Sequence, residues 1–438
     1  MHGNKFHTNF ISLLFILIFP NLPFSTSEIR TVQISSDDRA FILLQDFGFK
    51  SPGFISLSVS SFSINDPNSS ATPTRLSFMG FFYGPSPARP ALILALLKGS
   101  CILGSPFVFP ILKLGEKPVG LKKTVPVTIP DLYYIFFVNC AKNSSVSMTV
   151  DLESYNLGEG RRDYSDEHLA DLPRGVFVFS LVFFVFVLAW SHACVVYKRF
   201  LNRIHILMAF LLFSRFLELV CYANSLYSIR QTGSARFWNF LWLGFYFSRS
   251  VLFALVVVLI GSGWSIYRPV LQDFHKHVVS TAVSLQISSS VCFVLMRAFG
   301  PSSGSYKNWA VSYYTLDFLC CVAMVLPVFS EGSDRSGVGP AGSKTEGKEA
   351  KALVHERVFG KFGLALYGYV GSTRLGIFAM RCFGGHGIWY ATIVLEMTVG
   401  LAFYLVVYCM FWPNEKSYDY VAPDSKEGEI SVAILPGV

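Results

Sequence analysis

Seven long apolar runs between Gly175 and Trp412 constrain this chain more than any other feature. Each run has about the length that an α-helix needs to cross a bilayer. The pattern predicts a multi-pass membrane protein, which leaves receptor, transporter, trafficking factor and intramembrane enzyme as classes of function. The runs cover residues 175–196, 204–222, 237–260, 278–299, 309–329, 359–380 and 388–412, within a membrane domain of residues 173–413.

The composition agrees with a membrane protein. Hydrophobic residues make up 52% of the 438 residues and charged residues only 15%, whereas roughly a quarter of the residues of a soluble domain are charged. The net charge of +8 comes mostly from basic residues in the loops between the apolar runs. That placement indicates membrane topology rather than a phosphate-binding patch, so we expect no nucleic-acid partner.

Residues 1–27 have the features of a signal peptide. A short basic start precedes an apolar run from Phe10 to Phe19, and small residues before Glu28 suit signal peptidase. The run is short for a full membrane span, which favours cleavage over the alternative of an uncleaved signal anchor. The N-terminus would then be lumenal or extracellular.

Residues 28–172 show the alternation of a β-rich ectodomain. Ile55, Leu57 and Val59 alternate with serines, and residues 146–152 repeat this period of two. Turn-forming clusters separate further candidate strands near residues 76–83 and 133–140. Strands with one apolar face must pack two sheets together, so the segment predicts a β-sandwich.

The ectodomain also contains the residues expected to be modified in a secretory compartment. Cys101 and Cys140 are its only cysteines, and we expect them to be bridged, with two buried free thiols as the alternative. Asn68 and Asn143 begin its two N-x-Ser/Thr sequons and are candidate glycosylation sites.

Basic residues support the same orientation. They gather in the loops that would be cytosolic if the N-terminus is translocated. The stretch 331–357 is rich in glycine, serine and charge, and we expect a disordered cytosolic loop there, followed after the last span by a cytosolic tail of residues 414–438. The cytosolic basic residues are Lys198, Arg199, Arg203, Arg268, Lys276, Lys344, Lys348, Lys351, Arg357 and Lys361.

Ionisable residues inside the apolar runs are the sharpest functional signal. A lipid-facing charge at mid-bilayer costs at least ~2.5 kcal/mol, so we expect these side chains to converge on the bundle interior and pair. All fall between the middle of the bilayer and its lumenal side. They are Arg215, Glu218, Arg249, Asp317, Arg374 and Glu396.

This intramembrane cluster has two interpretations. In one it forms a polar pocket beneath the ectodomain for a ligand, a proton or a lipid headgroup; in the other it is an ion-pair network that fixes helix packing. If the cluster is a structural network, loss of Arg249 would leave a buried carboxylate without its partner. No arrangement of residues points to an enzyme, a cofactor or a metal: Asp317, for example, has no second intramembrane aspartate with which to form a catalytic pair.

Several short motifs resemble the lung seven-transmembrane receptor family, also described as Golgi-localised seven-transmembrane (GOST) proteins, which includes plant candidate G-protein coupled receptors. Arg215 and Arg249 fall where the family is expected to have lysine, and Ser284 where it usually has proline. The motifs lie at residues 203–209, 232–235, 258–265, 285–286 and 316–321.

The resemblance implies a lumenal sandwich similar to the GOLD domains of cargo-sorting proteins. It also implies residence in Golgi, post-Golgi or plasma membranes. The chain lacks an Asp/Glu-Arg-Tyr run after the third span and an Asn-Pro-x-x-Tyr in the seventh, so coupling by rhodopsin-like mechanics is not supported.

Three functions are therefore expected in order of preference. The first is a receptor-like protein that senses an extracellular or lumenal signal and engages a heterotrimeric G-protein α subunit. The second is a trafficking factor whose ectodomain binds cargo while its tail engages coat adaptors, for which the stretch from Tyr418 to Val421 is a candidate sorting signal. The third is an ion or solute pathway through the charged interior.

Overall fold

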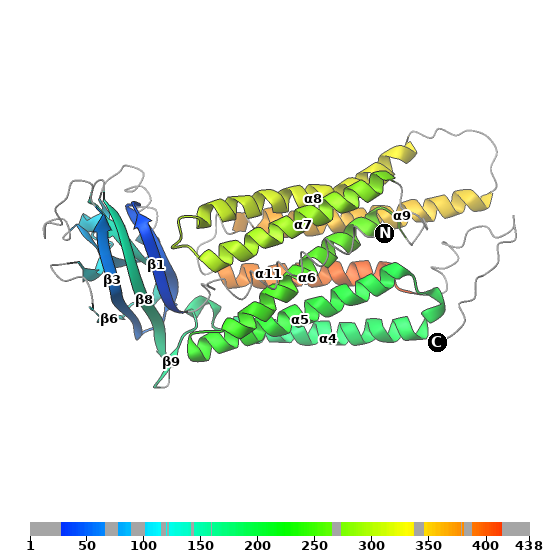
Figure 1. Ribbon diagram of the computed structural model, residues 1–438. Coiled ribbons are helices and arrows are strands. Elements are labelled where there is room, and N and C mark those ends of the chain that lie inside the picture. Colours follow the sequence, from blue (N-terminus) through cyan, green and yellow to red (C-terminus); the bar gives the residue numbers. More distant parts are fainter. Residues whose placement is uncertain are drawn as a thin grey trace, which may run out of the picture.

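The computed structural model has two parts, a β-sandwich and a bundle of long helices, and the sandwich lies at one end of the bundle (Figure 1). The expected signal peptide and cytosolic tail lie outside the residues that it describes. These residues are 28–65, 78–88, 101–114, 120, 122–141, 144–158, 160–264, 273–336, 346–377, 379–380 and 388–413.

The predicted sandwich is confirmed as two antiparallel sheets. One sheet has the order β1-β8-β3-β6, with β9 added to β8, and the other has the order β2-β7-β4-β5. The strands are β1 (Ile29–Asp37), β2 (Phe41–Phe49), β3 (Gly53–Asn65), β4 (Met79–Pro85), β5 (Phe109–Lys113), β6 (Lys122–Val127), β7 (Asp131–Asn139), β8 (Ser145–Gly158) and β9 (Arg161–Asp163).

The alternation read from the sequence defines the face that each sheet buries. Ile55, Leu57 and Val59 of β3 are fully buried, as are the apolar residues of β8 from Val146 to Leu152. They pack against residues of β2, β4 and β7 from the opposite sheet to form one core. The intervening serines of β3 and β8 face away from this core, as a period of two requires.

β7 is buried on both faces, which explains why its sequence is a continuous apolar run rather than an alternating one. Its inner residues join the sandwich core, whereas its outer residues, among them Phe136 and Val138, pack under the segment that contains Ile102 and Leu103. The disulfide between Cys101 and Cys140 ties this segment to the end of β7. The predicted disulfide is therefore confirmed, with a Cα–Cα distance of 5.7 Å.

Six helices among the described residues are long and apolar enough to cross a membrane, and they correspond to the first five and the last of the seven predicted spans. The helices of the bundle are α4 (Leu172–Val196), α5 (Arg203–Thr232), α6 (Arg236–Gly261), α7 (Asp273–Phe299), α8 (Tyr306–Ser336), α9 (Glu346–Val370) and α11 (Trp389–Met410).

The sixth predicted span, residues 359–380, contains the end of α9 and a π-helical turn at Gly371–Gly376. Phe362 and Leu366 of α9 are fully buried among residues of the bundle, so this segment is part of the helical core. The expected disordered loop at 331–357 differs from the structure: α8 continues to Ser336 and α9 begins at Glu346. Regular helix therefore replaces disorder on both sides of residues 337–345, which lie outside the described residues.

α5 extends well beyond its predicted span of 204–222. Its 30 residues reach Thr232, a length of about 45 Å, whereas the hydrocarbon core of a bilayer is about 30 Å thick. The helix ends at Gly233, whose φ of 72° is a left-handed conformation that glycine adopts without a Cβ penalty. The last turns of α5 consequently project toward the ectodomain.

The sandwich docks on the bundle through the edge formed by β1 and β2, which are edge strands of the two sheets. In Figure 1, β1 is the strand of its sheet nearest the helices and β6 lies on the far side. The amides of Glu28 and Ile29 both donate to the carbonyl of Gly233, at 2.9 and 3.3 Å. The start of β1 at this edge is thereby tied to the end of α5.

Candidate functional site

Three of the intramembrane charges form a compact cluster between α5 and α6. The carboxylate of Glu218 accepts a hydrogen bond from Nη1 of Arg215 at 2.9 Å and lies 2.8 Å from Nε of Arg249. Arg215 and Glu218 are three residues apart and share one face of α5, as their spacing predicts. Glu218 is only 4% exposed, so its charge is balanced by arginines rather than by water.

The two arginines hold Glu218 in different ways. Arg215 makes an aligned hydrogen bond, whereas Nε of Arg249 lies 2.8 Å from the same carboxylate in a charge-assisted contact that is less well aligned. The Arg249 guanidinium also lies over the ring of Tyr246 at 5.1 Å, and the Arg215 guanidinium lies 5.8 Å from the Phe183 ring centroid. Aromatic faces thus supply part of the solvation that the arginines lose in the bundle.

A second ion pair joins α8 to the π-helical turn. Nη2 of Arg374 lies 3.1 Å from Oδ1 of Asp317, which is 8% exposed. Arg374 sits inside the turn Gly371–Gly376, and π-helical turns widen a helix locally and shift the direction of its side chains. The turn is the segment that presents Arg374 to Asp317.

The structure corrects the expectation that all six charged side chains are interior. The Arg374 side chain is 41% exposed, and Glu396 is exposed on α11. Glu396 nevertheless lies within electrostatic range of Asp317 and of the buried Tyr222. The four interior charges are Arg215, Glu218, Arg249 and Asp317. The Arg374 side chain extends from its ion pair with Asp317 toward the surface of the bundle.

The charge cluster has consequences for its own stability. Three arginines and three carboxylates are balanced over all six residues, but the Arg215–Glu218–Arg249 triplet carries one excess positive charge. Since Glu218 has two partners, loss of one arginine leaves a paired carboxylate instead of the stranded one expected from the sequence.

The hydroxyl of Tyr404 is buried close to the charge cluster. It has no hydrogen-bond partner among the described residues and lies within electrostatic range of Arg215 and Arg249.

The ectodomain reaches the same helix that carries Arg215 and Glu218. Asp163 of β9 forms an ion pair with Arg230 of α5 at 3.1 Å, and the amide of Tyr164 donates to the carbonyl of Arg230. Together with the bonds to Gly233, these contacts define a junction, the surface where β1 and β9 meet the end of α5. The junction places the sandwich on the C-terminal end of the helix that carries the charge cluster.

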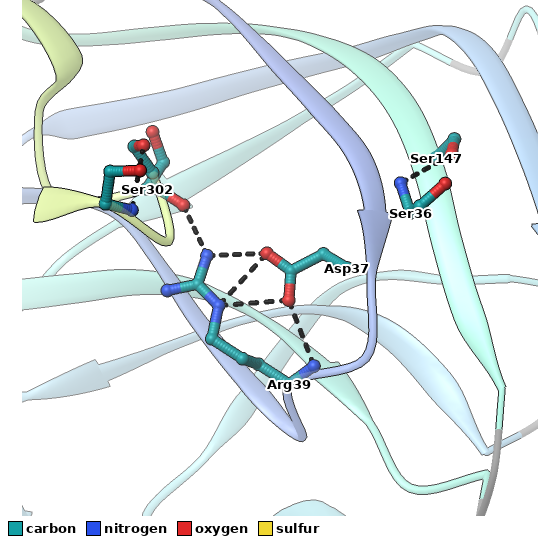
Figure 2. A network of polar contacts seen from close by, with 7 residues as sticks. Ser36, Asp37, Arg39, Ser147 and Ser302 are labelled. Atoms are coloured by element: carbon teal, nitrogen blue, oxygen red, sulfur yellow. Dashed lines mark hydrogen bonds and ion pairs between the residues drawn. The ribbon is translucent and has the colours of Figure 1, made fainter.

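A second contact ties the ectodomain to the loop between α7 and α8. Figure 2 shows the Arg39 guanidinium between the Asp37 carboxylate and the carbonyl of Ser302. Nη2 of Arg39 donates to Oδ2 of Asp37 and to the carbonyl oxygen of Ser302, each at 2.6 Å. Because Asp37 fixes the arginine at the β1–β2 turn, the sandwich is held at two separated points, one on α5 and one before α8.

Sequence reasoning missed the junction. The sequence does not single out Arg230, and Gly233 falls only within the motif at residues 232–235. One usable signal was present: polar residues continue after Tyr222 without a proline or glycine until Gly233, which is the pattern of a helix that continues to a glycine cap.

The remaining predicted site residues lie outside the described residues. These are Asn68, Asn143, Tyr418 and Val421. Within the described part of the chain, no group of three or more His, Cys, Asp or Glu side chains could hold a metal ion.

Comparisons with known proteins match both parts of the fold. A family model described as the CAND6/7 N-terminal domain matches residues 30–156, and one described as the GOST seven transmembrane domain matches residues 175–331. A protein of Arabidopsis thaliana named candidate G-protein coupled receptor 6 is 31% identical over 434 residues, which cover 97% of this chain and 99% of that protein. With the sandwich, the helical bundle and this full-length similarity in place, the chain belongs to the GOST family of seven-transmembrane proteins, in the group that has the CAND6/7 N-terminal domain.

Proposed function

We propose that this protein is a receptor-like seven-transmembrane protein whose ectodomain senses a lumenal or extracellular signal and whose cytosolic face engages a G-protein α subunit. Its role is recognition, not catalysis. The similar Arabidopsis protein carries the name of a candidate G-protein coupled receptor, which agrees with the proposal. The proposed location is a Golgi, post-Golgi or plasma membrane, with the N-terminus on the lumenal or extracellular side.

One observation carries this proposal: a single helix links the ectodomain to the charge cluster. Arg230, near the lumenal end of α5, is bound by Asp163 of the ectodomain, and Arg215 and Glu218 lie farther along the same helix. Helices move as stiff units, so a shift of the sandwich displaces α5 where it contacts Arg249 of α6. Such a linkage is what a receptor needs to convert binding outside the membrane into rearrangement within it.

The test uses resonance energy transfer between the cytosolic tail of the full-length protein and a panel of Gα subunits in cells. We expect transfer to at least one Gα above the level given by an unrelated multi-span membrane protein. Arg230→Asp should change that transfer, and adding Asp163→Arg should restore it because the ion pair is re-formed with reversed charges.

The matched control is Arg236→Asp, since Arg236 is an exposed arginine at the start of α6. It should leave the transfer unchanged. Transfer no higher than that of the unrelated protein across the whole Gα panel would reject the proposal.

A second function, binding of lumenal cargo for transport, is favoured by the far edge of the sandwich. Phe107 and Phe109 are 52% and 45% exposed, and β5 is the edge strand opposite the docked β2. Exposed aromatic side chains beside an open edge are typical of protein-binding surfaces. Coat adaptors on the cytosolic side would then be the partners of the tail.

Proximity labelling from the ectodomain tests the cargo function. The double variant Phe107→Ser/Phe109→Ser should lose specific lumenal proteins that the wild type labels, whereas Ile129→Ser, a control at another exposed apolar residue of the sandwich, should retain them. Identical labelling by the wild type and the double variant would exclude this surface as a cargo site.

A further inference from the structure

The junction contains a cluster of carboxyl groups around the residue that begins the ectodomain. The carboxylate of Glu28 accepts a hydrogen bond from Nε2 of Gln45, and Gln45 is fully buried and accepts a hydrogen bond from the equally buried Ser154. The Glu28 amide meanwhile donates to Gly233 of the helix bundle. One residue therefore connects the interior of the sandwich to the end of α5.

Three acidic side chains in this cluster repel one another electrostatically. Asp46 of β2 and Asp166, which begins the short helical turn Glu167–Leu169, both lie within electrostatic range of Glu28. Asp166 accepts hydrogen bonds from the amides of Gly48 and His168, at 3.0 and 2.8 Å.

Arg30 of β1 is the cation that opposes the acidic side chains at Glu28, and His168 is the titratable neighbour of Asp166. Glu28 and Asp166 are half-buried and Asp46 is exposed, and three carboxyl groups opposed by one arginine cannot all ionise there without cost.

We propose that the junction binds a proton at Glu28, so that lumenal pH controls how firmly the ectodomain is docked on α5. When the carboxyl is neutral, it stays against Gln45 and the amide keeps its bond to Gly233. When it ionises beside Asp46 and Asp166, repulsion from these carboxylates at its half-buried position favours movement of Glu28 further into water, which pulls the start of β1 away from Gly233.

The pKa values of the carboxyl groups support firmer docking at low pH. Burial raises the pKa of Glu28 to about 7, with Arg30 and the hydrogen bond from Gln45 opposing the shift and Asp166 and Asp46 adding to it. Burial also raises the pKa of Asp166. A carboxyl whose pKa is raised in the docked state stabilises docking fully below its usual pKa, and this contribution is lost as pH rises through about 7.

Processing directly before Glu28 would add one more charged group, the α-ammonium of residue 28 itself. It would lie at the negative end of the α5 dipole and would move the midpoint for Glu28 to lower pH, but the sign of the dependence would stay the same. The experiment is therefore made on the mature full-length protein.

Hydrogen–deuterium exchange of the full-length protein in lipid nanodiscs tests the proposal between pH 5.5 and 8, with labelling times scaled for intrinsic exchange. Amides of residues 29–34 and 228–236 should be more protected at pH 5.5 than at pH 8, by on the order of tenfold. Glu28→Gln, which mimics the neutral carboxyl, should be protected at both pH values. Asp151→Asn, at a more exposed carboxylate of β8 that contacts Thr31 and Ser60, is the matched control and should keep the wild-type response.

Asp46→Asn gives an independent test at an exposed residue whose change should not prevent folding. It removes a like charge, so the midpoint of the protection change should move to lower pH. Protection in the wild type that does not change with pH, a pH response that persists in Glu28→Gln, or an unmoved midpoint in Asp46→Asn would each overturn the proposal.

Discussion

Glu218 is the residue whose loss should damage the membrane domain most. Its carboxylate neutralises two arginines at 2.9 and 2.8 Å in a site where it is itself 4% exposed. Glu218→Leu would leave Arg215 and Arg249 facing each other without a counter-ion. Removing the shared partner of a buried ion pair costs about 3–5 kcal/mol.

Arg249→Leu should be milder because Glu218 keeps its aligned hydrogen bond to Arg215. The loss is then one charge-assisted contact, worth about 1.5–3 kcal/mol. The double variant Glu218→Leu/Arg249→Leu leaves a single unpaired arginine, so it should be more stable than Glu218→Leu alone, although it removes one more native side chain.

Thermal stability of the purified full-length protein, read by size-exclusion chromatography after heating, measures this order. At about 2–4 °C per kcal/mol, Arg249→Leu should lower the melting temperature by at least about 3 °C and Glu218→Leu by at least about 6 °C. Export from the endoplasmic reticulum, assayed in the same cells, should fall in the same order because destabilised chains are retained and degraded. An Arg249→Leu variant as unstable as Glu218→Leu, or a double variant worse than both, would refute the shared-carboxylate model.

Three further predictions concern the ectodomain. Gly233→Ala should lower the melting temperature and raise hydrogen–deuterium exchange at the start of β1. The new Cβ would lie 2.8 Å from the side chain of Ile29, and the φ of 72° disfavours alanine. Heating of the purified protein measures the first effect, and exchange of the peptide that begins β1 measures the second. Replacing Cys101 and Cys140 together by Ala should cost about 2–5 kcal/mol and retain the chain in the endoplasmic reticulum, and mass spectrometry of the wild type should find the bridged peptide, whereas two free thiols would contradict it. Glycosidase treatment of the mature protein should reduce its mass through Asn68 and Asn143, and Asn→Gln changes at both should abolish that reduction.

The parts of the fold that could be predicted from the sequence are those with a simple period. Residues 146–152 show the two-residue alternation of a strand with one buried face, and β8 has that pattern of burial. β7 does not alternate, because the segment held by Cys101 covers its outer face; no local pattern shows that a distant segment will do so. The predicted strand at 133–140 was nevertheless close to the observed Asp131–Asn139.

The candidate site was predictable in its residue types and less so in its geometry. The three-residue spacing of Arg215 and Glu218 was enough to place them on one face of a helix. The exposure of Arg374 could not be predicted, because it depends on a π-helical turn, and the glycines at 371 and 376 signal only weak helix propensity. Contacts such as Arg230 with Asp163 join residues 67 positions apart and depend on how two domains dock.

The length of α5 is the feature that connects these observations. The residues from Ala223 to Thr232 are not needed to cross a bilayer, since the preceding 20 residues already reach about 30 Å. They place Arg230 about 22 Å from Arg215, at the height where the ectodomain can bind it. Because the helix is continuous between these two arginines, the sandwich cannot move with Arg230 while α5 stays fixed against α6. In the proposed receptor function, the Arg215–Glu218–Arg249 cluster is thus the point at which movement of the ectodomain is either resisted or passed on to the rest of the bundle.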